Sequence, residues 1–354
     1  MRLFILTASD FEIPALVIYQ KIVDIIIAGN DSAQLHFYIV GDHIPYHFQE
    51  AYTTNESNVT IIKTREAQQL VGQVTNAMVL HFGSILKGSE SFPHYFIPLT
   101  YPNIDKTASF FNQFRQQRRF NKYIKKAAGV FYINQWGEDA LNNKYKKEGS
   151  HFQHAVLPTA VPPVFDWLIL SETKSDLTQG SNYFLCFMQP ANFVATLKEF
   201  SHFKKWQQTT MAMVFVFDTY KQCAFAHSLL KGYKYKESIY IKCIHEVKME
   251  WIAASYAIFW GHINFNKTSW IQWAIHYDVP HLIDQKNNIP ESWLRAGEVF
   301  SFDLSQSLSD HFKLYYRDEV YRQARANMGS EWLSNLEMIA PADGSVKIPA
   351  DLKA

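Results

Sequence analysis

Cysteine is scarce in this sequence, with three residues in 354, spaced widely at Cys186, Cys223 and Cys243. An odd number of cysteines without a Cys-x-x-Cys pair argues against a disulfide framework and against a structural zinc site. Reduced thiols of this kind are typical of the cytoplasm, so we predict a cytoplasmic protein.

Long hydrophobic runs and an excess of one charge are also missing. No apolar run approaches the roughly 18 residues that a membrane span needs. The opening MRLFILTASDFEIPA has no basic region followed by a long apolar core, so we expect no signal peptide. The formal net charge is only +1, which argues against nucleic-acid binding through bulk electrostatics.

The chain is long enough for two domains with separate cores, and 47% of its residues are apolar. Apolar runs typical of buried strands occur in both halves: RLFILTA, LHFYIVG, VTIIK, AMVLHFG, HYFIPLT and GVFYINQ in the first, and NYFLCFM, MAMVFVFD, SIYIKCI, YAIFWG and VPHLID in the second. Helical patterns separate them, including 13–28, 193–206, 248–255 and 309–336. This alternation predicts an α/β protein with two doubly wound, Rossmann-like domains facing across a cleft.

A segment rich in Pro, Ser and Thr separates the halves, and Pro158, Pro162 and Pro163 interrupt any helix there. We therefore place an N-terminal domain at 1–160, a linker at 161–180 and a C-terminal domain at 181–325. Ligands are expected where the strands of such domains end.

The order of elements from about 75 to 335, and best from 183 onward, resembles the GT-B glycosyltransferases, in particular the retaining, nucleotide-sugar-dependent enzymes of family 4. The resemblance is carried by YFLCFMQPANFVATLKEF, by SIYIKCIHEVKMEWIAASYAIFWG, by NFNKTSWIQWAIHYDVP and by GSEWL. It implies an acceptor-side first domain, a second domain that binds the nucleotide-sugar, and a C-terminal helix and tail, 326–354, that return toward the first domain.

The sequence departs from the family in the donor loop, after the first strand of the second domain, and near the N-terminus. Asn264 and Gln272, eight residues apart, stand where the family has two glutamates. The family's Arg and Lys after the first strand of the second domain are absent from MQPAN, and LTASDFEIPA lacks the family's N-terminal glycine-rich loop. The site is therefore either divergent and active or able to bind without turnover.

The residues of this loop suggest specific roles. Lys267 is a candidate for binding the donor phosphates. Thr268 and Ser269 begin the next helix, so either their backbone amides point at the phosphates or one of these residues serves only as a helix cap. Gln272 matches the residue that holds the ribose hydroxyls, or else it lies on an exposed helix face. Asn264 would lie near the reacting carbon as a catalytic residue.

Two histidines lie at the ends of predicted strands, in places where enzymes of the family bind their substrates. His81 in AMVLHFG is a catalytic candidate on the acceptor side, and His262 in WGHINF a candidate beside the donor; either could instead be a hydrogen-bonded core residue. Trp260 and Trp270 flank the donor loop, so they are either core residues or stacking partners for a base or sugar. No Asp-x-Asp triplet occurs, so we expect no metal and no other cofactor.

A basic run, FRQQRRFNKYIKK, spans residues 114–126. As a helix it would align Arg115, Arg118, Arg119, Lys122 and Lys126 on one face. That face either contacts anionic lipid at the inner side of a membrane or is simply solvated.

These features predict a glycosyltransferase that moves a sugar from a nucleotide-diphospho-sugar to a glycan or glycolipid, retaining by resemblance and independent of metal. The alternative is a non-catalytic pseudo-glycosyltransferase that binds a nucleotide-sugar or a glycan as a subunit of a larger assembly. A sugar-nucleotide epimerase of the same fold is a further alternative that no local feature favours.

Overall fold

The computed structural model divides the chain into two compact units, Met1–Ala160 with Asp343–Ala354 and Val161–Ala342, and each is described by itself. The structure describes residues 2–8, 35–41, 59–74, 77–82, 86, 88–89, 92–97, 118, 127–132, 153–156, 163–262, 268–287, 294–301 and 307–339. None of the helices within these ranges is long and apolar enough to cross a membrane.

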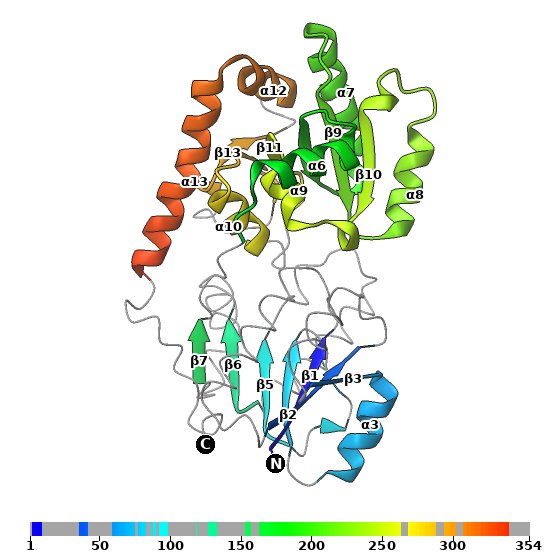
Figure 1. Cartoon of the computed structure of the whole chain (residues 1–354), viewed down its shortest axis with the longest axis vertical. Coiled ribbons are helices and arrows are strands. Elements are labelled where there is room, and N and C mark those ends of the chain that lie inside the picture. Colours follow the sequence, from blue (N-terminus) through cyan, green and yellow to red (C-terminus); the bar gives the residue numbers. More distant parts are fainter. Residues whose placement is uncertain are drawn as a thin grey trace. The chain divides into compact units, whose positions relative to one another are not determined.

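The first unit contains a seven-stranded sheet in the order β3-β2-β1-β4-β5-β6-β7, in which every pair is parallel (Figure 1). Its strands are β1 (Arg2–Ala8), β2 (Leu35–Val40), β3 (Val59–Ile62), β4 (Ala77–Phe82), β5 (His94–Ile97), β6 (Gly129–Tyr132) and β7 (Gln153–Val156). The chain leaves β1 in one direction and β4 in the other, as in doubly wound folds.

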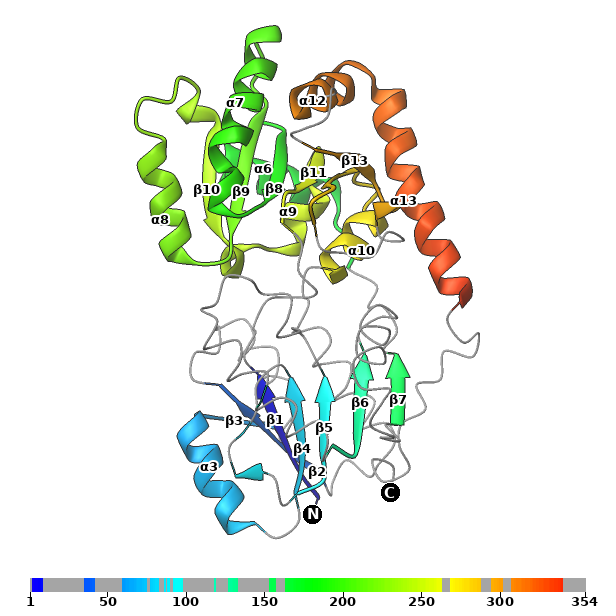
Figure 2. The same ribbon diagram turned by 180° about the vertical axis from the view of Figure 1, so that it is seen from behind.

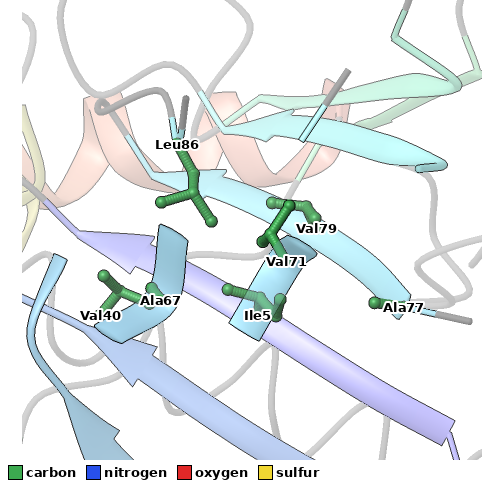
Figure 3. Packing of buried hydrophobic residues seen from close by; sticks show 7 residues of the cluster. All are labelled: Ile5, Val40, Ala67, Val71, Ala77, Val79 and Leu86. Carbon is green, nitrogen blue, oxygen red and sulfur yellow. The ribbon is translucent and has the colours of Figure 1, made fainter. Parts of the chain in front are cut away.

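Helix α3 (Thr64–Gln73) covers this sheet with Ala67 and Val71, which lie four residues apart and so share one face. They pack against Ile5, Val40, Ala77, Val79 and Leu86 (Figure 3). The carboxylate of Glu66 accepts a hydrogen bond from the backbone of Lys63 (3.1 Å), which satisfies one free amide at the start of the helix.

The second unit contains a six-stranded parallel sheet in the order β10-β9-β8-β11-β12-β13. Its strands are β8 (Tyr183–Phe187), β9 (Ala212–Phe217), β10 (Ile239–Cys243), β11 (Ala257–Trp260), β12 (His281–Asp284) and β13 (Glu298–Phe300). Every residue of β8, β9, β11 and β12 is buried, as expected for a parallel sheet covered on both faces.

The helices of this unit are α6 (Trp167–Thr178), α7 (Pro190–Trp206), α8 (Tyr220–Leu229), α9 (Met249–Ala253), α10 (Thr268–His276), α12 (Leu308–Arg317) and α13 (Glu319–Ile339), with short 3-10 turns η4 (Lys236–Ser238) and η5 (Ile244–Glu246). Helices α6 and α9 lie in front of the sheet in Figure 1, and α7 lies in front of it in Figure 2. The ring of Phe184 on β8 packs against Phe203 of α7 (5.8 Å between ring centroids) and Phe312 of α12 (4.4 Å), and so joins the sheet to these two helices.

Both halves are thus parallel α/β sheets, which confirms the predicted fold class. The predicted linker, 161–180, contains helix α6, because Asp166 accepts a hydrogen bond from Ile169 N (2.9 Å) and starts the helix after the prolines. The prediction that 309–336 is helical is confirmed: α12 and α13 cover this segment, and they are separated at Asp318, whose backbone is extended.

A hydrogen bond between two fully buried rings joins β11 to β12. The indole of Trp260 donates to Nδ1 of His281 (3.0 Å), so His281 carries its proton on Nε2, an atom with no partner among the described residues. Burial lowers the pKa of His281 from 6.5 to about 3.

We expect this histidine to make folding stability fall in acid. Between pH 6.5 and about 3 the unfolded chain protonates His281 while the folded chain does not, so its contribution is complete above pH 6.5 and is lost toward pH 3. Urea denaturation over this range should show the slope of stability against pH reduced in His281→Gln by up to about 1.4 kcal/mol per pH unit. An unchanged slope in the variant would contradict a neutral buried ring.

Candidate functional site

The candidate site lies where β8 and β11 end, at the carboxyl edge of the second sheet. These strands are neighbours, but the chain leaves β8 toward β9 and leaves β11 toward β12. In an open parallel sheet, connections that part in this way leave a crevice outside the strand ends, and ligands bind there.

A hydrogen bond between two side chains crosses this point. Gln189 follows β8, His262 follows β11, and the amide nitrogen of Gln189 donates to Nε2 of His262 (3.3 Å). The accepting role of Nε2 leaves Nδ1 of the neutral ring as a donor. Both side chains are half-buried, so they remain within reach of a ligand.

The backbone brings these two residues together. Phe187 O accepts hydrogen bonds from Gly261 N (2.9 Å) and His262 N (3.0 Å). A Cβ atom at Gly261 would lie 3.0 Å from Cζ of Phe259 and 3.3 Å from Cβ of Met188, which is tighter than ordinary packing. Glycine is therefore the residue that permits this close approach.

Helix α7 starts directly at this edge, with Pro190 at its first position. Gln189 is its N-cap residue but makes no side-chain cap hydrogen bond, because its amide is directed to His262. The start of the helix thus has no side-chain cap, although Asn192 N donates to Gln189 O (3.2 Å), and the positive end of the helix dipole favours an anion.

Helix α10 carries one polar side chain into an apolar environment. Residues 270, 271, 273, 274 and 275 are all buried, and Gln272 between them is only 5% exposed. Its neighbours on the helix are therefore apolar side chains of the core, and a polar group in such surroundings is costly unless it finds a hydrogen bond. The alternative of an exposed face for Gln272 is therefore wrong.

The other residues of the predicted donor loop are only partly described. Asn264 and Lys267 lie outside the described residues. Thr268 and Ser269 form the first positions of α10, as expected for residues that open a helix, but their side chains are not described.

The two tryptophans beside this loop are core residues. Trp260 stacks on Phe187 (4.6 Å between ring centroids), and Trp270 packs against Trp273 (5.6 Å). Both are fully buried, so of the two alternatives the structure supports a place in the core. An aromatic residue near a site is more often part of the packing beneath it.

His81 lies in the first unit and is fully buried on β4. Its Nδ1 contacts Thr7 Oγ1 (3.4 Å) and Leu86 N (3.5 Å), and its Nε2 contacts Ser89 Oγ (3.4 Å). These contacts are those of a hydrogen-bonded core histidine, and a catalytic role for His81 stays a prediction.

Two residues at the edge were not singled out from the sequence. Gln189 was noted only within MQPAN, for the absence of Arg and Lys; yet Pro190 marks the start of a helix and thereby places Gln189 at the strand end. Asn287 donates to Trp260 O (2.7 Å) and fixes the end of β11. No sequence motif announces Asn287.

Metal ligands do not gather in the part of the chain that the structure describes: no three His, Cys, Asp or Glu residues there are placed to hold an ion. Of the basic run at 114–126, only Arg118 is described, and it is exposed. The predicted lipid contact of that run therefore lies almost wholly outside the described residues.

Solved structures with the same architecture match nearly the whole chain. HepE of Anabaena, in complex with UDP and glucose, aligns over 96% of both chains with a TM-score of 0.64 and 9% identity. WaaG, a glycosyltransferase involved in lipopolysaccharide biosynthesis, aligns over 98% of this chain and 97% of its own, with a TM-score of 0.62 and 12% identity. MnaA of S. aureus, bound to UDP, aligns over 96% of both with a TM-score of 0.59 and 13% identity.

The fold is that of the GT-B glycosyltransferases. No protein-family model and no curated protein matches the sequence. The likeness to GT-B proteins is thus one of architecture, with few shared residues.

Proposed function

We propose that this chain is a glycosyltransferase that binds a nucleotide-diphospho-sugar at the carboxyl edge of its second sheet. The observation that carries the proposal is the Gln189–His262 hydrogen bond across the point where β8 and β11 part, beside the uncapped start of α7. Solved GT-B structures that contain UDP or UDP-glucose make a uridine nucleotide the first donor to test.

The chemistry of this site suits a diphosphate leaving group without a metal. Negative charge builds on the diphosphate as the glycosidic bond breaks, and preorganised donors can stabilise it. The positive end of the α7 dipole would favour the anion, and the amides of Thr268 and Ser269 with the ammonium of Lys267 would supply donors.

Gln272 is proposed to hold the ribose hydroxyls of the donor. Its amide has both a donor and an acceptor to offer to a ligand. Asn264 is proposed to lie near the anomeric carbon, where an amide can hydrogen-bond to sugar hydroxyls. A retaining outcome, a glycan or glycolipid acceptor and a catalytic His81 are further parts of the proposal.

The second candidate function is a pseudo-glycosyltransferase that binds the donor without transfer. It is favoured by the two amides at Asn264 and Gln272, because neither can supply the negative charge that stabilises a positively charged transition state. Binding experiments do not separate the two functions, but turnover does.

The first prediction concerns affinity for the diphosphate. UDP should bind without divalent metal, and Gln189→Ala and His262→Ala should each weaken binding roughly 5- to 100-fold, since a lost hydrogen bond to a buried or charged group costs about 1–3 kcal/mol. Isothermal titration calorimetry measures this directly. Gln323→Ala and His276→Ala, at exposed positions of α13 and α10, are matched controls that should bind as the wild type does.

The second prediction separates a role of Gln272 in binding from one in folding. Gln272→Leu keeps the volume but removes a polar group from a position that is only 5% exposed, so the free protein should be equally or more stable while nucleotide affinity falls. Denaturation and calorimetry on the same variant give both values. Lower stability with unchanged affinity would show that the amide serves the fold.

The third prediction tests transfer itself. If the wild type turns over the donor, Asn264→Ala should slow kcat more than it raises KM, because a group near the reacting carbon acts more strongly on the transition state. Donor hydrolysis or transfer in the two proteins gives this comparison. If the wild type binds UDP-sugars but never turns them over, the pseudo-glycosyltransferase is supported, and activity in Asn264→Glu would identify the missing charge as the cause.

A further inference from the structure

Helix α8 and the turn after it form a surface that has lysines but no carboxylate. We call residues 219–236 the α8 surface. No Asp or Glu occurs between Asp218 and Glu237, whereas Lys221, Lys231, Lys234 and Lys236 lie in this interval and are exposed. Asp218 and Glu237 flank the interval and Glu246 acts electrostatically on Tyr220 and Cys223, so the excess of positive charge is greatest at Lys231 and Lys234, in the turn after the helix.

Apolar side chains are exposed among these lysines. Phe225 is 52% exposed and Leu229 is 37% exposed. They lie four residues apart, and Lys221 lies four residues before Phe225, so the three share one side of α8. The opposite side of the helix faces the sheet with Cys223 and Ala226 buried, so this arrangement belongs to a packed helix of the fold.

The lysines are held in place but not neutralised. Gly232 adopts a left-handed conformation (φ 84°), and the hydroxyl of Tyr233 donates to Leu197 O on α7 (2.9 Å), which fixes the turn. Among the described residues no ion pair includes Lys231 or Lys234, and Lys236 reaches only the exposed Glu237, at 3.9 Å.

We propose that the α8 surface docks on an anionic lipid bilayer. Phe225 and Leu229 would enter the boundary between headgroups and acyl chains, while the lysines meet anionic headgroups. A soluble polyanion would pair with the lysines but leave the two apolar side chains in water. The surface is separate from the basic run at 114–126, and the proposal does not depend on the donor site.

A comparison within the same unit supports this choice of partner. Trp167 at the start of α6 is more exposed, at 78%, but Asp166 precedes it and Glu172 follows it on the helix. An anionic membrane would repel that region, so exposed aromatic surface alone does not predict docking. The α8 surface differs from that region because lysines, and no carboxylate, stand between Thr219 and Lys236.

Co-sedimentation of the full chain with vesicles tests the proposal. We expect binding to phosphatidylcholine vesicles that contain phosphatidylglycerol, weak binding to phosphatidylcholine alone, and weaker binding as salt increases. Lys231→Ala with Lys234→Ala should lower the partition coefficient roughly 10- to 30-fold, since each lysine near an anionic surface contributes about fivefold. Phe225→Ala should lower it roughly fivefold or more.

Trp167→Ala is the matched control and should bind as the wild type does, with circular dichroism and the melting temperature showing that every variant is folded. Equal loss in Trp167→Ala, undiminished binding in the α8 variants, or binding lost only in Arg118→Ala with Arg119→Ala would overturn the assignment. The assignment would also be overturned if the protein bound a soluble polyanion such as heparin but not vesicles, and if Phe225→Ala left heparin binding unchanged.

Discussion

The candidate site depends on one close contact, between the ends of β8 and β11. Phe187 O accepts two backbone hydrogen bonds from the residues that follow β11, and Gly261 allows the approach because it has no Cβ. This contact sets Gln189 and His262 at hydrogen-bond distance. The stacked rings of Phe187 and Trp260 lie beneath it, so the packing of the sheet and the geometry of the site share the same residues.

Much of the fold could be predicted from the sequence because buried parallel strands are continuous apolar runs. Runs such as MAMVFVFD leave little alternative, and β9 is buried at every position. The strands that went unpredicted are β7 (Gln153–Val156) and β13 (Glu298–Phe300), which are short and include polar residues. Their pairing with a neighbouring strand makes them part of the sheet, and pairing is a long-range property.

Some residues have roles that depend on where the fold places them, so the sequence alone could not assign them. Pro162 and Pro163 indicated a linker, but prolines are tolerated before a helix, and α6 begins four residues after them with Asp166 as its cap. For the tryptophans next to the donor loop the sequence left two alternatives open, because whether a ring faces a ligand or the core depends on the neighbouring strand and helix. Gln189 was overlooked because its role arises only when β8 and β11 lie side by side.

The burial of α10 gives a physical reason for an amide at Gln272 in place of the family's carboxylate. An ionised carboxylate at a position only 5% exposed would cost several kcal/mol unless it were paired. An amide costs less and keeps both hydrogen-bonding functions for a ligand. The same reasoning applies at Gln189: a carboxylate there could cap α7, but it would place negative charge where an anion is proposed to bind. Both amides thus place no negative charge where the phosphates are proposed to bind, and they remain able to hydrogen-bond.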